Sequence, residues 1–554
     1  MGLLHRIDKF LELDGSNNMQ NKDIVPIPIN RRKWGYTGYI SYWAIMNLCP
    51  VTWSVGASLL TVGLNGAHAM GTVVVGNFIV CLATIIAAVY GSNYHIGFSV
   101  FQRVVFGIRG AYYGVLVRSI LSVVWFASQS YLGGLCVNLV LSSWSKSYMN
   151  MKNHFPDSVK MTSQELIGYV IYLIITVPSL MVPPEYYDYI LATSSAATFF
   201  CGLGITIWAV KENGGSGTLM NTPITLSSSD FGWMWMYGIN SWYSSLVAGI
   251  ANQSDFSRFN KKPIHFYLGT LIGNTLSGFI VPLFGIICAS ALEEKYGVEL
   301  WKPNDIGMFW LQNDYSPSRR AGAFFSGVAL VYSQLAICGI GNAISGGMDL
   351  STIFPRYINI RRGAMIILIL VWPTQPWLFY NSSSVFISVM SSFSVFVTPM
   401  VAVYICEYFL VRRCIIKLSD CYINSSKSIY WYHQGINWKG IVISILGSAP
   451  GLPGLINAAN PKIKISRGIE NFYYGSFIFQ FVTTFAMYAI VSFIWKPEVG
   501  TRDNVDYFNT YTEEECMKLG IIPYNGQLPE DISETESDEY KKDLVVQTVK
   551  HQKE

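Results

Sequence analysis

Residues Asn47-Leu48-Cys49-Pro50-Val51-Thr52 interrupt the first long apolar stretch of the chain, which runs over residues 36–65. Proline has no amide hydrogen to donate and its ring crowds the preceding turn, so a helix over this stretch should break at Pro50. Backbone groups freed at membrane depth are tolerated only beside protein or a water-filled cavity. The stretch therefore predicts a broken membrane helix that faces a cavity.

Further apolar stretches follow along the chain, and each approaches the roughly 20 helical residues that a bilayer core requires. Hydrophobic residues make up 51% of the 554 residues and charged residues only 13%, about half the charged share of a soluble domain. In lipid, runs of this length indicate helices. We predict an all-α membrane protein with 12 transmembrane helices, near residues 36–65, 70–91, 112–143, 165–182, 188–210, 231–251, 264–292, 321–345, 364–380, 384–411, 438–460 and 471–495.

The sixth predicted span carries a second interruption, Tyr237-Gly238-Ile239-Asn240-Ser241-Trp242. If the first ten spans form two halves of five helices, this interruption and the one at Pro50 occupy matching positions. Paired interrupted segments of this kind indicate the midplane binding site of a secondary transporter. The alternative is a proline kink and a packing glycine, which are common in membrane helices; the pairing favours the binding site.

Polar and aromatic residues near these interruptions are candidates for binding a flat heterocycle. Trp125 and Gln129 lie four residues apart in the third span, on one helix face. An indole can stack on a ring while an amide reads its polar edge; the alternative is that Trp125 packs in the core and Gln129 joins two helices. The predicted substrate-binding residues are Asn47, Trp53, Trp125, Gln129, Asn240, Ser241, Trp242 and Asn342.

Asn342 belongs to a run of small residues in the eighth span, Cys338 to Gly347. Small residues let a neighbouring backbone approach closely, so helix packing alone could explain the run. An amide in this medium must still find a partner. Substrate is one candidate for that partner.

Other classes of function have little support. The seven histidines are dispersed, and the ten cysteines lack the spacing of a disulfide framework or a zinc site, so we expect no metal site. No histidine has a carboxylate at useful spacing, so we predict no catalytic residues and no enzyme. The net charge of +4 is scattered among short loops, which disfavours nucleic acid as a partner.

Asp255 and Arg258 at the end of the sixth span are predicted to form a gate or a structural pair.

The chain divides into an N-terminal arm (1–34), a twelve-helix domain (35–495) and an acidic tail (496–554). Low apolar content predicts that the tail lacks stable structure. Lys541 and Lys542 are available for modification, so trafficking or ubiquitylation machinery is a candidate partner at the termini. The alternative is a solvated tail without such a role.

Twelve spans place both termini on one side of the membrane. The basic residues predicted on that side are Arg31, Arg32, Lys33, Arg103, Arg109, Arg258, Lys261, Lys262, Arg356, Arg361, Arg362, Arg412, Arg413 and Lys417. The positive-inside rule makes this side cytoplasmic, although some lysines fall on the other side. We expect a multi-pass protein of the plasma membrane with both termini in the cytoplasm.

Several strings resemble the fungal branch of nucleobase-cation symporter family 1, also called the purine-cytosine permease family. They are Asn21 to Pro28, Phe98 to Gly107 with Arg103, Trp125 with Gln129, Asp255-Phe256-Ser257-Arg258-Phe259, Gly347-Met348-Asp349-Leu350, and Phe354 to Gly363. The likeness covers residues 20–500, and the last string is specific.

The resemblance implies two inverted five-helix repeats with broken first and sixth helices, two additional C-terminal helices, and alternating access. It implies a ligand stacked by Trp125 and Trp242 and held by Gln129 and Asn342. Bacterial sodium-coupled relatives present hydroxyl side chains from the eighth helix to the ion, whereas the matching positions here are Ala336 and Ile337. The resemblance therefore implies proton coupling rather than sodium coupling, and no cofactor.

Within that branch the chain is most similar to the thiamine and nicotinamide riboside permeases, through Ala251-Asn252-Gln253-Ser254-Asp255, Arg320 to Phe325, Ser333-Gln334, Tyr380 to Ser384, and Pro450 to Gly454. The leading hypothesis is proton-coupled uptake of a vitamin or nucleoside of this type by a secondary active transporter. Uracil, uridine, cytosine and allantoin remain alternative substrates. A non-transporting nutrient sensor is the alternative from a different class.

Overall fold

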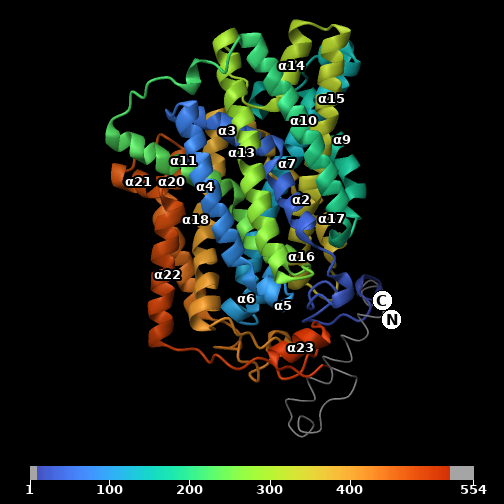
Figure 1. The fold of residues 1–554 in the computed structure, drawn as a ribbon, viewed down its shortest axis with the longest axis vertical. Coiled ribbons are helices and arrows are strands. Elements are labelled where there is room, and N and C mark those ends of the chain that lie inside the picture. Colours follow the sequence, from blue (N-terminus) through green and yellow to red (C-terminus); the bar gives the residue numbers. More distant parts are fainter. Residues whose placement is uncertain (1–8, 524–554) are drawn as a thin grey trace.

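The computed structural model describes residues 9–523, and this part of the chain is built from helices without a β-strand (Figure 1). Nine helices are long and apolar enough to cross a membrane, and a bent pair, Tyr36–Asn47 and Pro50–Val62, makes a tenth candidate within the same residues. The all-α membrane class is confirmed. The predicted number of twelve is not, because α11 (Ser228–Asn252) and the 11-residue α17 (Ile360–Leu370) are not among these candidates.

The first span breaks where the sequence predicts. α2 (Tyr36–Asn47) and α3 (Pro50–Ser58) are bent by 50° relative to each other, and Cys49 between them is extended. Pro50 is the first residue of α3, a position at which the missing amide hydrogen leaves no bond unmade. The helix therefore ends and restarts around residues 48 and 49.

The predicted break at Tyr237–Trp242 is wrong, because α11 is helical through all six residues. Glycine keeps its amide hydrogen and can remain in a helix at a cost of about 1 kcal/mol. Gly238 instead permits close packing: a Cβ there would lie 2.7 Å from Thr72 Oγ1 of α4 (Gly66–Ala87). The chain turns only beyond Asn252, where the short α12 (Ser254–Ser257) follows.

The helices form two packed groups around the break in the first span. α13 (Pro263–Tyr296) packs on α2, α3 and α4, and α11 packs on α4. In the second group, α7 (Ala111–Trp144) packs on α9 (Ser163–Leu180), on α15 (Pro317–Ile337) and on α16 (Ser345–Ile353). α18 (Ser383–Cys406) contacts α11 and α22 (Ser476–Ile494), and α22 lies at the outer edge of the bundle (Figure 1).

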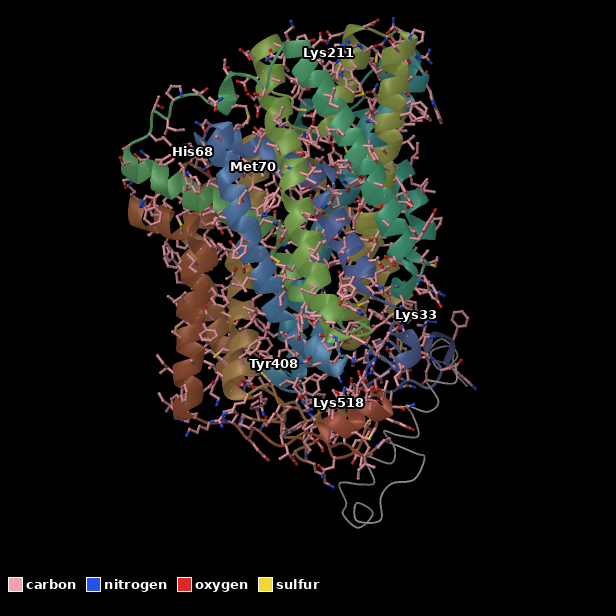
Figure 2. All side chains as sticks on the ribbon, in the orientation of Figure 1. Lys33, His68, Met70, Lys211, Tyr408 and Lys518 are labelled. Carbon is pink, nitrogen blue, oxygen red and sulfur yellow. The ribbon has the colours of Figure 1, made fainter. Side chains whose placement is uncertain are left out.

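The N-terminal arm and the segment after α22 cover the same end of the bundle, which we call the terminal end. Lys33 and Lys518 lie at this end, whereas Lys211 lies at the opposite end (Figure 2). The arm is tied to the chain after α12, since Trp34 N–H donates to Phe259 O (3.1 Å) and Lys261 N–H donates to Trp34 O (3.0 Å). The loop after α16 also contacts the arm, since Asn21 Nδ2 donates to Pro355 O (3.0 Å) and Ile358 O (3.1 Å).

The predicted lack of structure in the tail is wrong for its first part. Val505 and Phe508 are buried, and Asp506 accepts a hydrogen bond of 2.7 Å from Tyr511 N–H. α23 (Glu513–Leu519) follows, with a capping box between Thr512 and Glu515. These apolar and capping residues anchor an otherwise acidic segment. Lys541, Lys542 and the rest of residues 524–554 lie outside the described residues.

Candidate functional site

A small cavity of about 30 Å³ lies at the break in the first span. It is lined by Met46, Cys49, Val51 and Thr52 of the first span, Trp125 and Gln129 of α7, Ser245, Leu246, Ala248 and Gly249 of α11, and Ile337, Gly341 and Asn342 of the eighth span. A cavity of this size has room for water but is far smaller than the roughly 300–1,000 Å³ of a typical ligand pocket. In this conformation the helices have closed onto the cavity.

Three of the lining side chains have a buried polar atom without a hydrogen-bond partner among residues 9–523. These atoms are Trp125 Nε1, Gln129 Oε1 and Asn342 Nδ2. An unpaired buried polar atom costs about 1–3 kcal/mol, which a suitable ligand would recover. Two donors, one acceptor and an indole face suit a flat ring with polar edges.

The wall that carries Asn342 is a π-helical turn, η6 (Cys338–Ile344), between α15 and α16. Single π turns within α-helices are often found at functional sites. Gly341 lets the first span approach, since a Cβ there would lie 3.2 Å from Met46 Sδ. The run of small residues in the sequence thus brings an amide beside the helix break, although the π turn was not predicted.

Trp125 packs against an aromatic side chain that was not predicted. Phe393 of α18 lies with its ring centroid 5.0 Å from that of Trp125, at an interplanar angle of 41°. A tilted pair of this kind contributes about 0.5–1.5 kcal/mol beyond its buried area. Phe393, rather than Trp242, is therefore the ring that faces Trp125 in this structure.

Two predicted residues of the first span do not line the cavity. Asn47 Nδ2 donates to Asn274 Oδ1 (2.8 Å) and Ser277 Oγ (3.0 Å) of α13, which joins the end of α2 to that helix. Trp53 lines a separate cavity of about 10 Å³ and packs on Phe284. Both residues lie near the break but point toward α13 and its neighbours.

The predicted residues of α11 also lie away from the cavity. Asn240 donates to Ser391 O (3.4 Å) and accepts from Ser476 Oγ (3.2 Å), which joins α11 to α18 and α22. Ser241 Oγ bonds Tyr237 O within the helix, and Trp242 Nε1 donates to Asn77 Oδ1 of α4 (3.3 Å). Because α11 is continuous, the face that meets the cavity belongs to the later turn that contains Ser245 and Gly249.

The carbonyl groups freed by the break are bonded to hydroxyl groups. Ser333 Oγ of α15 donates to Leu48 O (3.2 Å). Thr52 Oγ1 donates to Cys49 O (2.8 Å) and bonds Asn47 O as well. Residues 9–523 contain no group of three or more His, Cys, Asp or Glu side chains that could hold a metal ion.

Between the cavity and the terminal end lies a buried cluster of Arg118, Asp255, Arg258 and Asp349, which we call the charge cluster. Arg118 Nη2 lies 3.2 Å from Asp255 Oδ2 and in direct contact with Asp349. The same atom donates to Ser345 O (2.8 Å). One guanidinium thus joins α7 to α12 and α16.

The charge cluster also reaches the N-terminal arm. Arg258 Nη1 donates to Asp23 O (2.9 Å), and Asp255 Oδ1 accepts from Phe98 N–H (2.9 Å). Removing one partner of a buried ion pair typically lowers the free energy of unfolding by about 3–5 kcal/mol. The predicted gate pair is therefore part of a larger cluster, in which Arg118 was missed although it is the sole charged residue between Ala111 and Trp144.

Comparison with known proteins gives a consistent family assignment. Residues 26–498 match the family model described as permease for cytosine/purines, uracil, thiamine, allantoin. The chain is 36% identical to the "Thiamine transporter" of Saccharomyces cerevisiae over 516 residues, 93% of this chain and 86% of that protein. It is also 36% identical to "Nicotinamide riboside transporter 1" of the same yeast, over 95% of this chain and 88% of that protein.

Among solved structures, the fold is similar to that of Mhp1, a nucleobase-cation-symport-1 family transporter. The closed conformation of Mhp1 with bromovinylhydantoin bound has a TM-score of 0.68 at 18% identity, covering 86% of this chain and 96% of Mhp1. Its inward-facing conformation has a TM-score of 0.67. Because the sequence identity is only 18%, the similarity shows a shared fold and nothing further.

Proposed function

The chain belongs to the family of permeases for cytosine/purines, uracil, thiamine and allantoin, and from this premise we propose that it takes up a small nitrogen heterocycle of the thiamine or nicotinamide riboside type. The observation that carries the proposal is the cavity at the helix break. There Trp125, Gln129 and Asn342 hold unpartnered polar atoms around an indole face. A ligand with a flat ring and a polar edge would satisfy all three.

Transport proceeds by alternating access to this cavity. The proposed gate toward the terminal end is the charge cluster, in which Arg118 bonds to groups on α12 and α16. Release toward that end requires the contact between Arg118 and Asp255 to separate, as α7 and α16 move relative to α12. Ligand binding can favour one state only through contacts that differ between the states.

The family implies a coupling ion, and we propose that this ion is the proton. Positions 336 and 337 of α15 carry no hydroxyl group. The hydroxyl groups of Ser333 and Thr52 reach the break, but they donate to Leu48 O and Cys49 O. These carbonyl groups are already bonded and are therefore poorer ligands for a sodium ion. Uptake should fall when the proton gradient is dissipated and remain unchanged when sodium is replaced by choline; the reverse pattern would contradict the proposal.

The proposed location is the plasma membrane, with the terminal end in the cytoplasm. Basic residues in the N-terminal arm and the loops support this orientation, among them Arg31, Arg258 and Arg362. A protease-accessible tag at either terminus should be cleaved only after the membrane is permeabilised. Cleavage in intact cells would contradict the orientation.

Uptake of radiolabelled compounds in cells that lack endogenous permeases tests the substrate class. Thiamine and nicotinamide riboside should accumulate and compete with each other. Uracil, uridine and allantoin serve as alternative substrates, since permeases for them in S. cerevisiae are 30% identical to this chain. If none of these compounds is taken up or displaces another while the protein is at the cell surface, the proposal fails.

A non-transporting sensor would depend on the acidic tail for its output. Truncation after residue 523 removes the tail beyond the packed segment that ends near Ile522. A transporter should keep its flux after this truncation. A protein that binds ligand with or without the tail, and never transports it, would favour the sensor.

A further inference from the structure

A groove of about 410 Å³ lies beside the ends of α18 and α22. Figure 1 shows that these two helices end at the terminal end of the bundle. The groove is lined by Leu410, Val411, Arg413, Ile415, Ala489, Ser492, Phe493, Lys496, Pro497 and Val499. Most of these side chains are apolar, and the two charged ones are both basic. The groove is separate from the cavity at the helix break.

The apolar wall of the groove belongs to two predicted membrane spans. Leu410 is 47% exposed and Phe493 69% exposed, on the candidate spans Ser383–Val411 and Ser476–Ile494. Exposed apolar side chains on such helices face acyl chains. Trp495, at the end of α22, is 60% exposed, and tryptophan is enriched at the membrane interface. The groove therefore spans the boundary between hydrocarbon and headgroups.

Two cations mark the headgroup side of this boundary. Arg413 and Lys496 have no ion-pair partner within the described part of the chain, and no carboxylate lines the groove. The adjacent Arg412 is instead buried, with its Nε 2.7 Å from Glu407 Oε1. Arg413 and Cys414 have φ values of 51° and 63°, so the chain turns sharply here. Of two adjacent arginines, one is neutralised in the core and the other lines the groove.

A second cavity at the terminal end differs from the groove in the balance of its charges. Its volume is about 380 Å³, and it is lined by Lys22, Arg31 and Arg361 but also by Asp23 and Glu185. Arg31 Nε pairs with Glu185 Oε1 at 3.0 Å. Its charges largely compensate one another, whereas those of the groove do not.

We propose that the groove binds an anionic phospholipid of the leaflet at the terminal end, which is the cytoplasmic leaflet under the proposed orientation. The phosphate and acidic headgroup lie against Arg413 and Lys496. An acyl chain packs along Leu410, Ala489 and Phe493. Charge complementarity selects the anion, and the apolar wall requires a hydrocarbon chain, which a soluble anion lacks.

Native mass spectrometry of the detergent-purified full chain tests this site with phosphatidylserine and phosphatidylcholine of the same acyl chains. The protein should retain phosphatidylserine in preference. Each surface cation contributes about fivefold to such binding, so R413Q/K496Q should weaken it roughly 30-fold. The matched control K462Q/K464Q, which changes two exposed lysines in the loop before α21 (Arg467–Tyr474), should leave it unchanged.

Two further measurements separate the contribution of the lipid's acyl chain from that of its headgroup. Ala489→Trp fills the groove without changing its charge and should abolish retention of phosphatidylserine. Glycerophosphoserine, which has the headgroup but no acyl chains, should not compete. Equal binding of both lipids, unchanged binding in R413Q/K496Q or in Ala489→Trp, or full competition by glycerophosphoserine would each overturn the proposal.

Discussion

Two segments of this transporter, residues 47–52 of the first span and residues 237–242 of α11, look alike in sequence and differ in structure. Both place polar residues in the middle of an apolar span, and both predict a break. The first segment breaks with a 50° bend between α2 and α3, whereas the second is continuous helix. The difference lies in Pro50, which cannot donate its hydrogen bond, against Gly238, which can.

The comparison shows what each kind of polar residue contributes. At the break, backbone carbonyls bond to Ser333 and Thr52, and the cavity opens beside them. In α11, the backbone is satisfied within the helix, and the side chain of Asn240 bonds to α18 and α22. The first segment lines the candidate site, and the second joins α11 to its neighbouring helices.

The largest expected effect is on transport when the break is removed. Pro50→Ala restores the amide hydrogen and favours a continuous helix by about 3 kcal/mol, or roughly a hundredfold in the equilibrium. Uptake per molecule at the cell surface should fall by a similar factor.

Gly238→Ala is the matched change in the continuous helix. Its new Cβ meets Thr72 Oγ1 at 2.7 Å, so the protein should lose about 1–3 kcal/mol of stability through overpacking. Uptake per surface molecule should persist. Equal loss of uptake in both variants would show that the two segments play the same role.

The next largest effects are expected from replacing Trp125 and Trp242. Trp125→Ala should weaken ligand affinity by about 1–3 kcal/mol, because a stacking ring is lost. Trp242→Ala should lower the melting temperature through the lost packing on Gly76 of α4 and the lost bond to Asn77, with affinity little changed. Competition binding and thermal unfolding on the same preparations separate the two effects; a larger affinity loss in Trp242→Ala would reverse the assignment.

A smaller effect is expected from the amides. Asn342→Leu removes a donor that faces the cavity and should change the preference between ligands by about 0.5–1.5 kcal/mol. Asn240→Leu should instead reduce protein abundance, since it removes bonds to α18 and α22. Uptake competition and immunoblotting measure the two outcomes. Parallel loss of abundance and transport in Asn342→Leu would favour a packing role.

The smallest effect concerns pH and His95, which follows α4 and α5 (Val89–Tyr94) at the terminal end. Burial, with the nearby Arg32 charge, lowers the pKa of His95 to about 3, and its Nδ1 lies 2.9 Å from Arg258 O. Tyr511 packs on its ring. The unfolded chain binds a proton below about pH 6.5 while the folded chain does not, so stability falls as pH drops from about 6.5 toward 3.

His95→Gln should remove part of this acid sensitivity. The melting temperature of the parent should fall more between pH 7.5 and pH 5 than that of the variant, so a deficit of the variant at pH 7.5 should shrink or reverse at pH 5. A parallel pH dependence in both proteins would show that another group is responsible.

Backbone chemistry and apolar length were enough to predict the helical class, the break at Pro50 and most span positions. Side-chain chemistry and the family resemblance predicted Trp125, Gln129 and Asn342 as binding residues, and the structure places all three around one cavity. The face of α11 that meets the cavity was not predicted correctly. The sequence pattern predicted a break in this helix, and a break would turn different residues toward the cavity. Phe393 and the π turn depend on contacts between distant spans. Arg118 was visible as a lone charge in an apolar helix, but its two carboxylate partners are over 100 residues away in sequence.

The most direct test is a structure of the protein by electron cryo-microscopy with a transported heterocycle bound. Ligand density should lie beside the break at residues 48 and 49, with a ring against Trp125 and polar atoms within hydrogen-bond distance of Gln129 Oε1 and Asn342 Nδ2. Density against Trp53 or Trp242 instead, outside the cavity that Trp125 lines, would contradict the account.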